Sequence, residues 1–159
     1  YLETDSQLPK IIPSVAPFGQ VSQVIMEEKM ECWKQAYDLA IIWTQPDGVI
    51  DSFRKALEYN SVIIDEALEE VDAYSKALTQ CIGRVQTLFI PTWRLDAGNS
   101  GYGILERRPG IGLADLLARM NLRLAENLKD FSGVFVIDAE RWILSAGKEA
   151  CNTKLWYLG

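Results

Sequence analysis

Histidine is absent from this 159-residue chain, and this absence restricts its chemistry more than any other feature of the composition. The chain cannot supply a His-dependent catalytic triad, a histidine metal ligand or an imidazole acid–base catalyst. Cysteine is scarce as well. Cys32, Cys81 and Cys151 are widely spaced and form no CxxC pair, which argues against a zinc site. We expect all three to be reduced thiols in a cytoplasmic protein.

Long apolar runs and a basic-then-apolar leader are also missing. No apolar run approaches the ~20 residues that span a bilayer, so we expect no membrane partner. Basic residues are outnumbered, with 16 Lys and Arg against 22 Asp and Glu and a net charge of −6. This balance argues against nucleic-acid binding, which needs a cationic surface.

Apolar residues make up 48% of the chain, which is ordinary for a globular domain with its own core. We interpret residues 1–9 as a tail or linker and residues 10–159 as a single domain. Because the chain opens with Tyr1 rather than Met, we expect it to be a domain excised from a longer protein. The terminal aromatic segment, with Leu155, Trp156 and Tyr157, is expected to dock on the body of this domain.

Short apolar runs alternate with amphipathic stretches along the chain. The runs predict strands at residues 39–43, 85–90 and 134–137, and an edge strand or an irregular extended segment at 10–15, which Pro13 interrupts. Helical periodicity predicts helices at residues 20–34, 51–59, 60–82, 113–128 and 139–146. This alternation predicts an α/β fold, a three-layer sandwich with a mainly parallel sheet and helices on both faces.

The carboxyl ends of parallel strands are where open sheets bind ligands. A long glycine-rich loop, residues 94–112, follows one predicted strand, and loops of this length are often functional. The candidate ligand- or partner-binding residues at these places are Phe18, Gln20, Trp43, Asp47, Trp93, Arg94, Asn99, Arg107, Arg108 and Arg141.

Each group of candidates also has a purely structural interpretation. Asp47 sits in a Pro-Asp-Gly turn, and Asp138 is well placed to be a helix N-cap. Arg107 and Arg108 can be a solvated basic pair, and aromatic residues at strand ends are usually part of the core. For catalysis, the candidates are Ser14 and Asp138, although no serine lies in a GxSxG motif and no histidine can activate one.

Four segments together resemble the N-terminal region of FkbH-like proteins. They are VAPFGQV at residues 15–21, IWTQPD at 42–47, NLRLA at 121–125, and VIDAERW at 136–142 followed by KLWYLG at 154–159. The resemblance spans residues 10–159. It implies an α/β domain of the SGNH-hydrolase type, related to flavodoxin-like folds, that precedes a haloacid-dehalogenase-like domain. The serine and histidine blocks of SGNH hydrolases are not found in this chain.

The resemblance implies an accessory role in loading a glyceryl unit from bisphosphoglycerate onto an acyl carrier protein, as in polyketide-type pathways. The domain would then dock the carrier protein or cover the active site of its neighbour. A shared basic patch of Arg94, Arg107, Arg108 and Arg119 would help an acidic carrier to bind. No cofactor is expected in this chain, and Mg²⁺ is expected only in the following domain.

Two other functions stay open at this point. The chain can be a divergent SGNH esterase or acyltransferase, for which Ser14 and Asp138 are the candidates. Alternatively, it can be a flavodoxin-like module that binds a small molecule, with Phe18, Trp43 and Trp93 stacking on the ligand.

Overall fold

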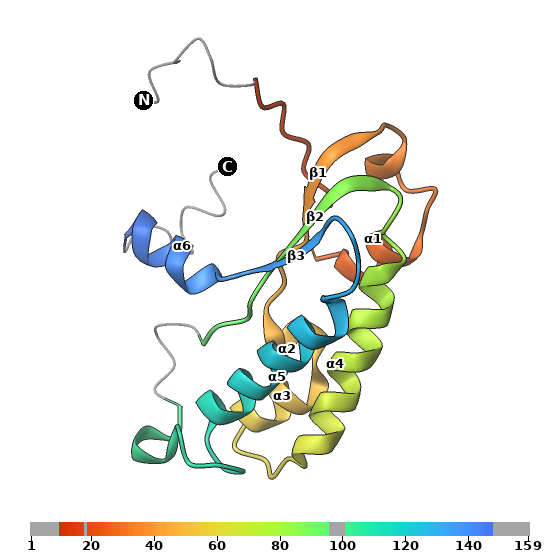
Figure 1. Ribbon diagram of the computed structural model, residues 1–159. Helices are drawn as coiled ribbons and strands as arrows, with labels where there is room; N and C mark the ends of the chain where they lie inside the picture. Colours follow the sequence, from red (N-terminus) through yellow and green to blue (C-terminus); the bar gives the residue numbers. More distant parts are fainter. Residues whose placement is uncertain (1–9, 18, 96–100, 148–159) are drawn as a thin grey trace.

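The computed structural model describes residues 10–17, 19–95 and 101–147 (Figure 1). The predictions for residues 1–9, Phe18, Asn99, Cys151 and the terminal segment with Leu155, Trp156 and Tyr157 lie outside the described residues.

Three parallel strands form the sheet, in the order β1-β2-β3. They are β1 (Tyr37–Ile41), β2 (Val85–Pro91) and β3 (Val134–Ile137). Ala40 pairs with Leu88 and Leu88 with Val134, so these three side chains lie on one face of the sheet. The predicted α/β fold with a parallel sheet is confirmed.

Residues 10–15 do not form the edge strand that was one of their two predicted states. They have no regular secondary structure and are exposed. Pro13 carries no backbone N–H, so it cannot donate to a strand ladder. Tyr37 Oη donates to Ser14 Oγ at 3.2 Å, which places this segment beside the amino end of β1.

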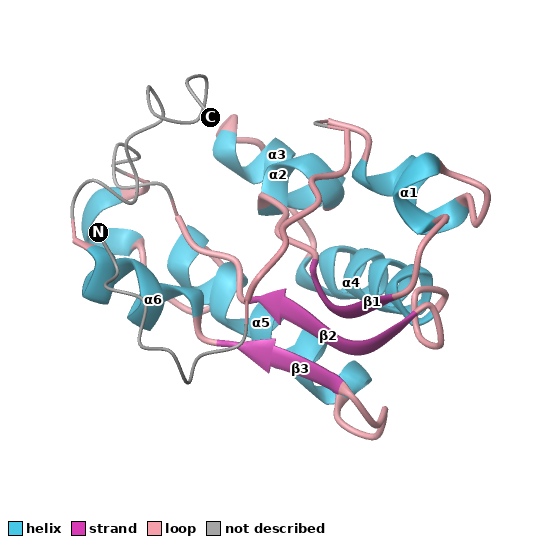
Figure 2. Ribbon diagram, turned by 90° about the horizontal axis from the view of Figure 1, so that it is seen from above, coloured by secondary structure: helices cyan, strands magenta, loops and turns pink. Residues whose placement is uncertain are grey.

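The two longest helices run side by side and cover one face of the sheet (Figures 1 and 2). They are α4 (Ile64–Thr79) and α5 (Leu113–Leu128). The predicted bounds of α5 are confirmed. All six residues of its predicted apolar stripe are buried, namely Leu113, Leu116, Leu117, Met120, Leu124 and Leu128. Helix α4 begins later than predicted, after Ile63, and neither Asn60 nor Ser61 caps it. Asn60 Nδ2 instead donates to Lys55 O at 3.2 Å.

The remaining helices are short. The carboxyl end of β1 leads into α2 (Pro46–Val49) and α3 (Asp51–Leu57). A 3-10 turn, η2 (Gly103–Leu105), precedes α5, and α6 (Ala139–Ala146) follows β3 with its predicted bounds. The helix predicted at residues 20–34 is wrong, because only α1 (Val21–Met26) and the 3-10 turn η1 (Glu31–Trp33) form there. Glu27, Glu28 and Lys29 between them offer no apolar group to bury.

Helix α1 and its neighbours lie at the amino edge of the sheet. Arg84, just before β2, donates from Nη1 to Ile25 O at 3.0 Å. The same guanidinium lies 5.4 Å from the centre of the Trp33 ring, within range of a cation–π contact. Gln20 is the exposed N-cap residue of α1, so it too is at this edge, away from the carboxyl ends of the strands.

The two covering helices are joined by a polar clamp as well as by apolar side chains. Arg123 on α5 makes two hydrogen bonds to the Asp72 carboxylate on α4, at 2.6 and 2.7 Å. Asn127 Nδ2 adds a third at 2.7 Å. Chiefly because of the hydrogen bonds from Arg123, the pKa of Asp72 is lowered from its usual value.

The opposite face of the sheet is apolar and largely uncovered in the described part of the chain (Figure 2). Ile41 pairs with Phe89 and Phe89 with Phe135, so these side chains share this face. Leu39, Ile41 and Phe135 are 45%, 49% and 52% exposed. On this side α6 brings Trp142 against Phe89, with 6.5 Å between ring centres. The architecture is compatible with a three-layer sandwich in which one outer layer is much thinner than the other.

Candidate functional site

Three side chains meet where β1 and β2 end, at the edge predicted to bind ligands. Trp93 Nε1 donates to Thr44 Oγ1 at 3.0 Å, and a 3.1 Å hydrogen bond joins Thr44 Oγ1 to Tyr74 Oη. The Tyr74 and Trp93 rings also touch, with centres 5.5 Å apart. Burial raises the pKa of Tyr74 to about 12, so its phenol is protonated at neutral pH.

The backbone of Trp93 is held as firmly as its ring. Asn121 on α5 accepts from Trp93 N through Oδ1 and donates to Trp93 O through Nδ2, both at 2.8 Å. An amide side chain can satisfy both backbone groups of one residue because it carries an acceptor and a donor. Trp93 is therefore a buried structural residue, as the core interpretation of strand-end aromatics predicted.

The end of β3 is closed by capping. Asp138 Oδ1 accepts from Arg141 N at 3.2 Å, which confirms the predicted N-cap of α6. Thr92 Oγ1 accepts from Ala139 N at 3.1 Å and ties β2 to the same helix. The polar groups at this edge thus satisfy one another. They form a brace, and the residues described at this edge include no paired carboxylates for acid–base chemistry.

The two candidates for catalysis lie at opposite ends of the sheet. Ser14 is beside Tyr37, the first residue of β1, whereas Asp138 follows Ile137, the last residue of β3. Because the strands are parallel, these positions are separated by the length of a strand, about 13–17 Å for four or five residues. The structure does not bring Ser14 and Asp138 together, so they cannot act on one substrate atom.

The other predicted binding residues are spread over several surfaces. Trp43 lies just after β1 and is part of the uncovered face, with 39% exposure. Asp47 is exposed in the first turn of α2 and Arg141 is exposed on α6. Arg94 is half-buried after Trp93, and Arg107 and Arg108 are exposed in the turns before α5.

The proposed basic patch contains at least one arginine whose charge is already engaged. Arg119 Nε donates to Asp115 Oδ2 at 2.9 Å, one turn away on α5. The hydrogen bond from Arg119 lowers the pKa of Asp115, and Asp115 in turn raises the pKa of Arg119. Arg119 therefore adds little net charge toward a partner.

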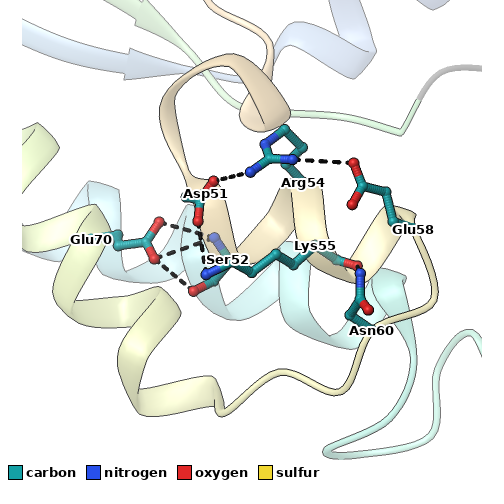
Figure 3. Close-up of polar contacts among 7 residues, drawn as sticks. All are labelled: Asp51, Ser52, Arg54, Lys55, Glu58, Asn60 and Glu70. Carbon is teal, nitrogen blue, oxygen red and sulfur yellow. Dashed lines mark hydrogen bonds and ion pairs between the residues drawn. The ribbon is translucent and has the colours of Figure 1, made fainter.

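A second polar cluster surrounds the first turn of α3 and was not expected from the sequence (Figure 3). The Glu70 carboxylate on α4 accepts from Ser52 Oγ at 2.6 Å and from Ser52 N at 3.1 and 3.2 Å. Asp51 accepts from Arg54 and Lys55 on the same helix. A carboxylate is favourable at a helix N-terminus, so this cluster anchors α3 to α4.

The structure also contains a cavity that no predicted site residue lines. It measures about 440 Å³ and lies between the α3–α4 connection and the segment that leads into α5. Stacked rings of Tyr59 and Tyr102 contribute to its wall. The available sequence signal was indirect: residues 94–112 are long for a connecting loop, and Tyr102 and the cavity residues 110–112 belong to it.

These observations define the class as an α/β domain with a small parallel sheet, whose carboxyl edge is braced by hydrogen bonds between side chains. Within residues 10–17, 19–95 and 101–147, no group of three or more Cys, Asp or Glu side chains is placed to hold a metal ion. Over the same residues, no helix is both long and apolar enough to cross a membrane. No family model, curated protein or solved structure matches the chain.

Proposed function

We propose that the chain is an accessory, non-catalytic domain of an FkbH-like protein, and that its uncovered sheet face docks a haloacid-dehalogenase-like domain. The observation that carries this proposal is the apolar surface of Leu39, Ile41, Trp43, Phe135 and Trp142, called here the open face. The substrate class, a glyceryl unit transferred to an acyl carrier protein, comes from the sequence resemblance.

The pattern of residues along the strands supports docking. Antiparallel sheets with one wet face alternate apolar and polar residues, whereas parallel sheets are covered on both faces. The outward positions of this sheet include Leu39, Ile41, Phe89 and Phe135 together with the polar Thr87, and none of the outward strand residues is charged. A cluster of exposed aromatic and aliphatic side chains of this kind is typical of a protein interaction site.

The arrangement of polar groups supports a role without catalysis. The Ser14 hydroxyl and the Asp138 carboxylate are a strand length apart, and Asp138 is engaged as an N-cap. Thr44, Tyr74 and Trp93 bond to one another at the carboxyl edge. A domain built in this way is suited to hold a neighbour in place.

Charge and polarity favour the dehalogenase-like domain over the carrier protein as the occupant. Carrier proteins are usually acidic, and this chain has a net charge of −6, so their long-range interaction is repulsive. The open face offers apolar contact and no cation. Such a surface suits the stable, largely apolar interface between neighbouring domains of one protein.

The test is an NMR titration of the ¹⁵N-labelled chain with two separate proteins. These are the haloacid-dehalogenase-like domain of an FkbH-like protein and an acyl carrier protein. We expect saturable shifts at Leu39, Ile41 and Phe135 with the first, and weaker shifts or none with the second. Phe135→Asp should weaken binding at least tenfold, because it buries a carboxylate in an apolar interface.

Leu122→Asp is the matched control. Leu122 is 72% exposed on α5, away from the open face, so the same change should leave binding intact. Trp142→Ala changes the open face without altering a strand, because Trp142 lies on α6, and it should also weaken binding of the dehalogenase-like domain. The proposal is wrong if the titrated domain shifts other residues or none, or if only the carrier protein binds. The docking proposal is also wrong if sedimentation shows that copies of the chain pair through the open face. It is wrong as well if the open face becomes accessible only after residues 148–159 are removed.

A further inference from the structure

The cavity beside α3 has features of a small-molecule site that are independent of the docking function. Its volume of about 440 Å³ falls within the usual range of ligand pockets, about 300–1,000 Å³. Its lining is mostly apolar and aromatic, with a few polar groups. The lining residues used in the argument below are Tyr59, Tyr102, Ile111, Leu113, Asp115 and Leu116.

Tyr59 occupies a position where glycine is the usual residue. It directly follows the last turn of α3, and its φ angle is +62°, in the left-handed region. Asn60 N donates to Lys55 O and Tyr59 N to Ala56 O, both at 3.0 Å, which is the Schellman pattern of helix ends. An L-residue is strained in this conformation, so the helix end itself does not account for a tyrosine.

Core packing does not account for Tyr59 either, because its side chain is 74% exposed. The ring instead stacks on Tyr102, with centres 5.5 Å apart and planes inclined by 21°. Tyr102 Oη donates to Ala56 O at 2.6 Å, and the Glu106 carboxylate accepts from Tyr102 N. Hydrogen bonds at both ends fix the Tyr102 ring, so the two rings form a preorganised aromatic wall.

The groups of the lining favour an uncharged or cationic ligand over an anion. Asp115 is the charged residue among the lining residues, and its carboxylate accepts from Gly110 N at 3.0 Å and is also paired with Arg119 on α5. Glu106 lies next to Tyr102 and also accepts from Ala114 N at 3.0 Å, at the start of α5. Two N–H groups that could attract an anion there, those of Gly110 and Ala114, are therefore already engaged by carboxylates. The negative faces of two tyrosine rings favour a neutral or positively charged partner.

We propose that this cavity binds a small planar aromatic molecule, uncharged or cationic, against the wall formed by Tyr59 and Tyr102. The apolar side chains of Ile111, Leu113 and Leu116 enclose the ring of the ligand, and the tyrosine faces favour a neutral or positive substituent.

Three probes of similar size test the proposal on the full chain by ¹H–¹⁵N NMR. They are benzamidine, a planar cation, indole, a neutral ring, and benzoate, a planar anion. We expect saturable shifts at the amides of residues 59–62 and 110–113 with benzamidine and indole, and at least tenfold weaker binding of benzoate. Comparable binding of benzoate, or no saturable shift with any probe, would overturn the proposal.

Variants at Tyr59 separate a binding role from a structural one. Tyr59→Gly relieves the left-handed strain, so the unfolding midpoint should not fall, whereas probe binding should weaken at least tenfold. Tyr59→Phe keeps the ring and should bind the probes within about twofold of the native chain. Native-like binding by Tyr59→Gly would show that the aromatic wall is not part of a site. Since neither variant touches the open face, failure here leaves the docking proposal standing.

Discussion

On the face of the sheet that α4 and α5 cover, Leu88 and Ile90 are at most 2% exposed, whereas Leu39 and Phe135 on the opposite face are 45% and 52% exposed. Both faces are largely apolar in sequence, and the main difference between them is how far other elements cover them. The comparison teaches that an apolar pattern predicts which faces of a sheet are buried in the working protein. It does not predict which element or domain covers them.

The topology explains why one face of the sheet is largely uncovered in the described part of the chain. The strands follow one another in the order β1-β2-β3, so both connections advance in the same direction across the sheet. Right-handed crossovers that advance in one direction place their helices on the same face. Helices α3 and α4 belong to the first connection and α5 to the second. A covering layer for the open face must come from outside these two connections.

The largest expected effect comes from truncating one leucine on each face. Leu88→Ala leaves a cavity beneath α4 and α5 and should lower the free energy of unfolding by about 2–5 kcal/mol. Leu39→Ala removes a side chain that is 45% exposed and should cost less than about 1 kcal/mol. Urea unfolding of the two variants measures the difference.

Equal losses in the free energy of unfolding of the two variants would contradict the difference between the covered face and the open face. A large cost for Leu39→Ala would mean that the open face is covered by other parts of the same chain. Adding the docked domain should raise the cost of Leu39→Ala without changing that of Leu88→Ala, because only the first residue would then become buried.

Elements with strong local signals could be predicted from the sequence. Helix α5 has a stripe of six apolar residues at helical spacing. Helix α6 has the Asp138 N-cap and ends just before Gly147. The prediction of one helix over residues 20–34 was wrong because the apolar residues on either side were joined across Glu27, Glu28 and Lys29. These three residues have no apolar group to pack, and the helix ends before them. Helix periodicity alone does not show whether a partner surface exists.

The site was harder to predict because its parts are distant in sequence or depend on backbone conformation. Thr44, Tyr74 and Trp93 meet only after β1, β2 and α4 have packed, and none of them stands in a local motif. Tyr59 reads as an ordinary residue between two helices. Its left-handed backbone marks it as unusual, and that is visible only in the structure.

The next largest effect is expected at high pH, on the covered side of the sheet. The pKa of Tyr74 is raised to about 12 by burial, whereas an exposed tyrosine titrates near 10. The unfolded chain therefore loses this proton first, and the free energy of unfolding falls between pH 10 and 12 by about 2–3 kcal/mol. Tyr74→Phe should lack this part of the fall. Identical pH profiles for the two proteins would mean that the strand edge is wetter than described.

Trp43 and Thr44, which follow β1, allow the open face and the covered side of the sheet to be compared at adjacent positions. Thr44→Val deletes the hydroxyl that serves both Tyr74 and Trp93, and should cost about 1–3 kcal/mol because two buried groups lose a partner. Thr44→Ser keeps that hydroxyl and is the control. Trp43→Ala removes a side chain on the open face and should cost less in the isolated chain. Thermal unfolding followed by Trp fluorescence distinguishes the three variants, and a larger loss for Trp43→Ala would contradict the order.

The smallest expected effect is in the clamp between the two covering helices. Since the pKa of Asp72 is lowered in the folded chain, its ionised form contributes stability at neutral pH, and this contribution is lost as pH falls below the usual value of 3.8. The pair is more than one third exposed, so Asp72→Asn should cost less than about 1 kcal/mol at pH 7 and less still near pH 2. Urea unfolding at both pH values measures the gap. A gap that is undiminished at pH 2 would show that the contribution of Asp72 does not depend on its charge.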